Sequence, residues 1–96
     1  MNRNSYHNQE QEYIHTFDDQ ESYWATFDLG CAAALASIGF EIVSLDRANP
    51  SKIKFIFVRK SGLEDSINDY WNFDLNVDAQ TYFNSIKRLK NQIYSG

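Results

Sequence analysis

The chain has 96 residues, of which 43% are hydrophobic and 16% aromatic; this fits one small domain with a core and excludes a fully disordered chain. A single cysteine excludes an internal disulfide and a cysteine-based zinc site, and no apolar run reaches the roughly 18 residues of a membrane span. The net charge of −4 belongs to residues 1–22, because residues 23–96 carry eight basic and eight acidic side chains.

Residues 1–21 are rich in Asn, Gln and acidic side chains, and we expect them to form a polar, acidic tail. The stretch Met1–Gln11 lacks the apolar core of a signal peptide, so we expect a soluble, cytoplasmic protein. Near the end of the tail, Tyr13–Phe17 are expected to dock on the folded part. We assign residues 22–96 to a single α+β domain.

The first elements of that domain are a strand and a helix. Residues 22–27 are rich in β-favouring side chains and predict a short strand. Asp28 is placed to cap a helix over residues 29–38, and Gly39 stands where a left-handed helix end is needed. The Ala-rich run of this helix predicts close packing and a buried thiol for Cys31.

A hairpin is expected next. Residues 40–46 and 52–59 predict two strands, joined by a turn at Arg47–Ser51 that holds the only proline. Phe55 and Phe57 are two residues apart and share one face of the second strand, which we interpret as the core face.

Two helices close the chain. Ser61 and Glu64 have the spacing of a capping box, and Asp78 is placed to cap the last helix. Between the helices, residues 72–77 are expected to be extended, as a short edge strand. The apolar positions predicted for the first helix are Leu63, Ile67, Tyr70 and Trp71, and those predicted for the second are Ala79, Tyr82, Phe83, Ile86, Leu89 and Ile93.

The order strand, helix, strand, strand, helix, short strand matches the split βαβ (ferredoxin-like) pattern with a C-terminal helix appended. We therefore predict an α+β fold. Its small antiparallel sheet is built on the hairpin 40–59, and the helices pack largely on one face.

The sequence contains no recognisable catalytic pattern. His7 and His15 both lie in the tail without a third ligand at metal spacing. No Ser, Cys or Thr has a base placed by a motif, and the glycines form no phosphate loop. We expect a protein that is not an enzyme and has no metal or cofactor.

Two kinds of partner remain open. Tyr70, Trp71, Phe73 and Tyr94 are the candidates for an exposed patch that binds a protein partner or a second copy of the chain. The competing interpretation places Trp71 in the core. We prefer a non-catalytic interaction module, acting as an accessory or regulatory factor.

The alternative is a single-stranded nucleic-acid-binding domain that uses the basic hairpin 47–60. Its phosphate-binding candidates are Arg47, Lys52, Lys54, Arg59 and Lys60, with help from Lys87, Arg88 and Lys90 if the last helix packs nearby. The strand 52–59 is a weak match to the basic-aromatic motif of RNA-recognition domains and lacks its glycine. A solvated hairpin edge is the competing interpretation.

Several short patterns also resemble a known family. They are Tyr23, Thr26, Asp28-Leu29, Ala33-Ala34-Leu35, Gly39-Phe40, Lys54-Phe55-Ile56-Phe57, Asp69-Tyr70-Trp71, Val77-Asp78, Phe83, Leu89-Lys90 and Tyr94. Over residues 23–94 the chain resembles a family of small uncharacterised bacterial and phage proteins that carries only a domain-of-unknown-function label. The resemblance implies an accessory protein linked to phage or mobile elements, and it supplies no functional residues.

Overall fold

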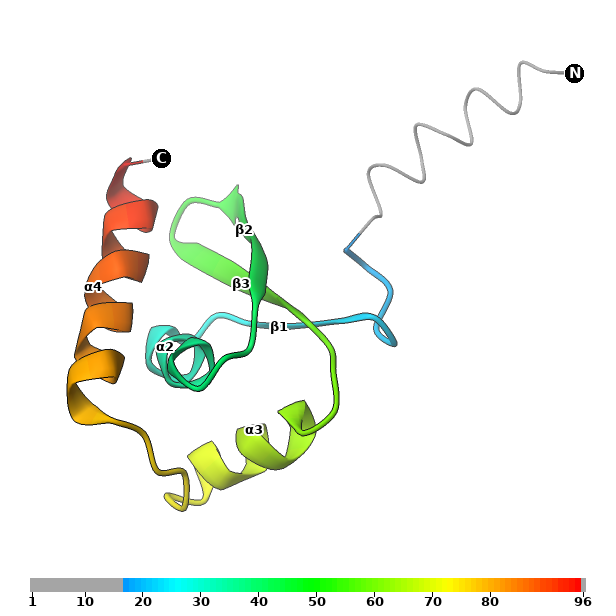
Figure 1. Ribbon diagram of the computed structural model, residues 1–96. Coiled ribbons are helices and arrows are strands. Elements are labelled where there is room, and N and C mark those ends of the chain that lie inside the picture. The colour runs from blue at the N-terminus through cyan, green and yellow to red at the C-terminus, as the bar shows by residue number, and fades with distance from the viewer. Residues whose placement is uncertain (1–16, 96) are drawn as a thin grey trace, which may run out of the picture.

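The structure is a computed structural model that describes residues 17–95, in which the chain forms three strands and three helices (Figure 1). In chain order they are β1 (Tyr23–Thr26), α2 (Leu29–Ser37), β2 (Ile42–Asn49), β3 (Lys52–Val58), α3 (Leu63–Trp71) and α4 (Ala79–Ser95). Most of the predicted tail, including Tyr13, lies outside the described residues. The boundary between tail and domain therefore stays a prediction.

The strands form one antiparallel sheet in the order β1-β3-β2, with β3 in the centre. β1 and β2 are joined through α2 and both pair with β3, so they run in the same direction without being neighbours. This is the arrangement that the split βαβ pattern requires. The predicted α+β fold with a C-terminal helix is confirmed.

The helices pack on one face of this sheet. The core cluster contains Phe55 and Phe57 from β3, Leu63 from α3 and Leu89 from α4. Because Phe55 and Phe57 are two residues apart in a strand, they point to the same side, as predicted. The remaining core residues come from α2, which packs against both other helices (Figure 1), and they are Cys31, Ala32, Ala33 and Leu35.

Both ends of α2 form as the sequence predicts. Asp28 Oδ1 accepts a hydrogen bond from the backbone N–H of Cys31 at 2.7 Å. At the other end Gly39 has a φ of 108°, and the N–H of Phe40 donates to the carbonyl of Leu35 at 3.1 Å. These features define a Schellman turn. Because Phe40 takes part in this turn, β2 begins after it rather than at it.

The β2–β3 hairpin is confirmed, but its turn is shorter than the predicted Arg47–Ser51. β2 continues to Asn49, which pairs with Lys52, so only Pro50 and Ser51 connect the two strands. Asn49 Oδ1 accepts the N–H of Ser51 at 2.9 Å. This side-chain hydrogen bond stabilises the tight connection.

α3 occupies its predicted place, but the capping box at its start was wrong. The N-cap is Gly62, with a φ of 90° and no side-chain cap. Glu64 instead accepts a hydrogen bond from Arg59 Nη1 at 2.6 Å. The chain enters the helix through a left-handed glycine turn, which leaves Ser61 outside the N-cap position.

The predicted edge strand at residues 72–77 was also wrong, since this segment forms a turn and a loop. α3 ends in a left-handed turn at Phe73, where the N–H of Asp74 donates to the carbonyl of Asp69 at 2.8 Å. The apolar alternation that suggested a strand is real. Its side chains line a groove between α3 and α4 instead of extending the sheet.

α4 starts as predicted, but its core stripe is narrower. Asp78 Oδ2 accepts hydrogen bonds from the backbone N–H and the hydroxyl of Thr81 at 2.9 and 2.8 Å, and these bonds lower the pKa of Asp78. Leu89 is buried and Ile86 packs against the core, whereas Phe83 is 58% exposed. Phe83 was therefore wrongly assigned to the core, because it falls outside the strip along which α4 contacts α2.

Candidate functional site

An apolar hollow lies between the end of α3 and the start of α4. We call it the α3–α4 groove, and its lining consists of Ala34, Tyr70, Phe73, Leu75, Val77 and Tyr82. Its volume is about 270 Å³, slightly below the lower end of small-molecule sites at roughly 300 Å³. The groove is therefore large enough to hold a bulky side chain.

Phe73 stands at the rim of this groove in an unusual conformation. Its side chain is 96% exposed. Its φ of 64° is the only positive value outside glycine in the described part of the chain. A side chain in this left-handed region destabilises the backbone by about 1–2 kcal/mol.

Comparison with the end of α2 shows what the conformation of Phe73 requires. Each helix end has an N–H that bonds to the carbonyl five residues earlier, from Phe40 to Leu35 in α2 and from Asp74 to Asp69 in α3. The left-handed position is glycine in α2 and Phe73 in α3. Because the Phe73 ring is not buried, packing within residues 17–95 does not offset its backbone strain. Strain of this kind is found at functional sites.

The groove residues Tyr70 and Tyr82 converge on the first turn of α2. A Cβ atom added to Gly30 would lie 2.8 Å from the hydroxyl of Tyr70 and 3.3 Å from both Asp28 Oδ1 and the hydroxyl of Tyr82. Burial, followed by the negative charge of Asp28, raises the pKa of Tyr70. The close approach of these oxygens depends on the missing side chain of Gly30.

The four predicted partner-binding aromatics do not form one patch. Trp71 is 53% exposed, so the core interpretation of this residue was wrong, and its ring packs edge-on against Tyr70 with centroids 5.0 Å apart. Tyr70 and Trp71 are the last two residues of α3, and Phe73 lies just after its end. Tyr94 is 80% exposed but lies about 18 Å along α4 from Tyr82. There it lines a hollow together with the hairpin residues Pro50 and Ser51.

Two of the predicted phosphate-binding residues make structural hydrogen bonds. Arg47 donates to the carbonyls of Gln92 and Ile93 at 2.6 and 3.0 Å, and so caps the end of α4. Arg59 donates to the carbonyl of Gln20 at 3.0 Å, besides its bond to Glu64. Both guanidinium groups therefore take part in hydrogen bonds within residues 17–95.

The lysines of the basic hairpin gather around aromatic rings. Lys52 and Lys54 lie over the ring of Phe27, at 5.3 and 5.7 Å from its centroid. Lys54 also approaches Asp46 at 3.8 Å. Lys60 lies over a different ring, that of Phe40. Arg47 lines one hollow together with Lys52 and Phe27, and Arg59 lines another together with Lys54. Lys60 lines neither of these two hollows.

Several residues beside the hairpin lysines and in the α3–α4 groove were not among those predicted from the sequence. Phe27, which is 52% exposed, joins the lysines only through the pairing of β1 with β3. Leu75 and Val77 complete the α3–α4 groove. Their apolar alternation was visible in the sequence, but it was interpreted as a strand.

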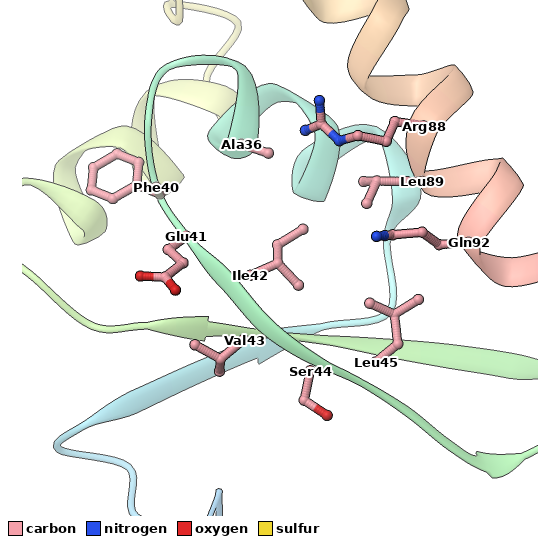
Figure 2. A pocket seen from close by; sticks show the side chains of 10 residues that line it. All are labelled: Ala36, Phe40, Glu41, Ile42, Val43, Ser44, Leu45, Arg88, Leu89 and Gln92. Atoms are coloured by element: carbon pink, nitrogen blue, oxygen red, sulfur yellow. The ribbon is translucent and has the colours of Figure 1, made fainter. Parts of the chain in front are cut away.

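A further cavity of about 350 Å³ lies between β2 and α4. Figure 2 shows Ile42 and Leu45 facing Leu89 of α4 across it, while Val43 points away. The register of β2 against β3 shifts between Ile42 and Ser44, so Val43 is an extra residue in the strand. The cavity lies beside this irregularity, and both apolar and polar side chains line it.

No group of three or more His, Cys, Asp or Glu within residues 17–95 is placed to hold a metal ion. The Cys31 thiol is buried as predicted, and burial raises its pKa to about 11. None of the helices between residues 17 and 95 is long and apolar enough to cross a membrane.

Comparison with known proteins gives a family. The domain of unknown function DUF5659 matches residues 21–95. The chain belongs to this family. No curated protein and no solved structure matches the chain. The DUF5659 match includes every element from β1 to α4, and a link to phage or mobile elements stays a prediction.

Proposed function

We propose that the chain is a non-catalytic protein-interaction module, an accessory or regulatory factor that binds its partner at the α3–α4 groove. The proposal rests on Phe73, because its ring is exposed and its backbone is held in a strained conformation. Aromatic side chains are favoured anchors at protein interfaces.

The energies are consistent with a role in binding. Burying a Phe side chain contributes about 1.5–3 kcal/mol, which exceeds the roughly 1–2 kcal/mol of backbone strain at Phe73. A partner that covers the ring can therefore offset the strain that the free domain carries. Trp71 and Tyr70 extend the same aromatic surface along α3.

The test is photo-crosslinking in the native cell, with a photoreactive amino acid in place of Asn76, which is exposed in the loop beside the groove. We expect one protein to be crosslinked when Phe73 is present and the crosslink to be lost in Phe73→Gly. Tyr94→Ala is the matched control, because it removes an exposed aromatic at the other end of α4.

Loss of the crosslink in Tyr94→Ala but not in Phe73→Gly would contradict the proposal. So would recovery of nucleic acid and no protein.

A second candidate function is binding of single-stranded nucleic acid at Phe27. The observation that favours it is the pair Lys52 and Lys54 over a half-exposed ring. Base–aromatic stacking contributes about 1–3 kcal/mol per base. The engaged guanidinium groups of Arg47 and Arg59 and the buried rings of β3 weigh against this candidate.

This alternative is tested with a short unstructured oligonucleotide at low and moderate salt, using the full chain and a chain without residues 1–21. Phosphate binding should weaken steeply with salt and should strengthen in the shorter chain, because net negative charge is removed. Unchanged binding in the double substitution of Lys52 and Lys54 by Ala would exclude this site, and no binding at low salt would exclude the function.

A further inference from the structure

The chain segment that supplies most of the lining of the α3–α4 groove carries only one sign of charge. From residue 61 to residue 86 the sequence has five acidic side chains and no basic one. They are Glu64, Asp65, Asp69, Asp74 and Asp78. Of these, Glu64 is paired with Arg59, and Asp65 lies in the first turn of α3, away from the groove. The negative charge beside the groove therefore rests mainly on Asp74 and Asp78, which adjoin its lining residues in the chain.

These two aspartates alternate with the groove lining. Phe73, Leu75 and Val77 line the groove, while Asp74 and Asp78 lie between and after them and are exposed. The loop therefore presents an apolar wall with carboxylates along its outer side. The carboxylates of Asp74 and Asp78 are therefore within reach of a segment that inserts a side chain between α3 and α4.

A further carboxylate, that of Asp28, lies beside the tyrosines of the groove. Asp28 Oδ1 and the hydroxyls of Tyr70 and Tyr82 all lie close to Gly30. The first basic residue of α4, Lys87, has its ammonium group over the ring of Phe83, 5.2 Å from the centroid. No other lysine or arginine occurs between Lys60 and Lys87, and within residues 17–95 neither Asp74 nor Asp78 forms an ion pair.

We infer that the α3–α4 groove binds a short segment of a partner protein in which an apolar side chain is flanked by Lys or Arg. The apolar side chain would fill the groove against Phe73, and the flanking cations would face the aspartates of the loop. This inference rests on the proposed function and specifies the chemistry of the partner. An acidic segment, or the phosphates of a nucleic acid, would be repelled by the same carboxylates.

The inference is tested by NMR titration of the ¹⁵N-labelled full chain with two model hexapeptides. One has a central Trp-Leu pair flanked on each side by two lysines, and the other has glutamates in place of the lysines. We expect the basic peptide to shift the amide signals of Leu75 and Val77, with an affinity that falls as salt is raised. The acidic peptide should leave these signals unchanged.

Two substitutions separate the charge from the groove itself. Asp74→Asn should weaken binding of the basic peptide about twofold to fivefold, as expected for one exposed ion pair. Glu41→Gln is the matched control, because it removes an exposed carboxylate on the segment before β2 and should have no effect. Phe73→Gly should abolish the shifts at Leu75 and Val77.

Equal binding of the two peptides, no binding of the basic one, or shifts that avoid the groove would each overturn the inference. The proposed function fails separately, if the cellular crosslink persists in Phe73→Gly. A crosslink that depends on Phe73 but is insensitive to salt and to Asp74→Asn would leave the proposed function standing and reject the basic partner.

Discussion

At the scale of single residues, Phe73 and Gly39 hold the same position at two helix ends. Both have a positive φ, and both precede the residue whose N–H closes the turn. Glycine adopts this conformation without steric strain, whereas a residue with a Cβ does not. The difference between the two helix ends is therefore a difference in strain, and it can be measured.

We expect Phe73→Gly to raise the free energy of unfolding by about 1 kcal/mol, because strain is removed and no buried surface is lost. Gly39→Ala should lower it by a similar amount, since a Cβ there meets no neighbour within 4 Å and only the backbone conformation opposes it. Urea titration of both variants measures the two effects. A destabilised Phe73→Gly variant would mean that the ring stabilises the fold.

Cys31 is the other residue whose surroundings decide its chemistry. Burial raises its thiol pKa from 9.0 to about 11. The folded state therefore holds its proton over a range in which the unfolded state has lost it. The resulting contribution to stability is complete below about pH 9 and is lost as the pH rises through about 11.

We expect the Cys31 thiol to be unreactive toward a thiol reagent at pH 8 in the folded chain and reactive in urea. The free energy of unfolding should fall between pH 9 and 11 more steeply in the wild type than in Cys31→Ala, which also controls for tyrosine ionisation. Rapid modification of the folded chain would show that the thiol is accessible.

At the scale of elements, α4 shows how tertiary contacts narrow an apolar stripe. Leu89 is almost fully buried, and Ile86 and Ile93 pack against the core. Phe83 belongs to the same stripe in sequence but is largely exposed. A helix on the surface of a small domain buries only the strip that meets its neighbour, which for α4 is mainly α2.

This contrast predicts different effects of two truncations in one helix. Leu89→Ala should lower the free energy of unfolding by about 2–5 kcal/mol, because it opens a cavity in the core. Phe83→Ala should change it by less than about 0.5 kcal/mol, as for other surface substitutions. Denaturant titrations compare the two, and equal losses would contradict the exposed position of Phe83.

At the scale of the whole molecule, stability is concentrated in the centre of the sheet and is low in the α3–α4 loop. β3 pairs with a strand on each side and contributes Phe55 and Phe57 to the core. In contrast, the backbone amides of Leu75, Asn76 and Val77 donate no hydrogen bond to another group in residues 17–95. The proposed binding surface therefore includes a loop whose backbone amides are not held by hydrogen bonds within residues 17–95.

Hydrogen exchange should reflect this difference. We expect the amides of Phe55, Ile56 and Phe57 to exchange most slowly, with free energies close to that of global unfolding. The amides of Leu75, Asn76 and Val77 should exchange fastest among residues 72–90. Exchange followed by mass spectrometry or NMR gives both values, and slow exchange of the loop would indicate hydrogen bonds that the described residues do not provide.

Much of the fold could be predicted because its signals are local. The Asp28 and Asp78 caps, the glycine end of α2 and the two-residue alternation of β3 each depend on a few neighbouring residues. Of the candidate site, the sequence indicated Tyr70, Trp71 and Phe73. It could not indicate that Ala34 and Tyr82 would join them, because those residues come from other helices.

Local patterns failed where two structures share one pattern. The alternation of Phe73, Leu75 and Val77 fits an edge strand and also fits a loop that covers a groove. The spacing of Ser61 and Glu64 fits a capping box, but Arg59 competes for the carboxylate. In each case the outcome depends on contacts with residues outside the pattern.

The sequence by itself therefore determined the order of the elements from β1 to α4 apart from the strand predicted at 72–77, the caps at Asp28 and Asp78, and the core face of β3. These features follow from backbone geometry and the spacing of apolar side chains. Only the tertiary structure decided which aromatic residues are exposed, how the basic residues are divided and where the groove lies. Those features depend on how α2, α3 and α4 pack on one another, and packing brings together residues that no local spacing connects.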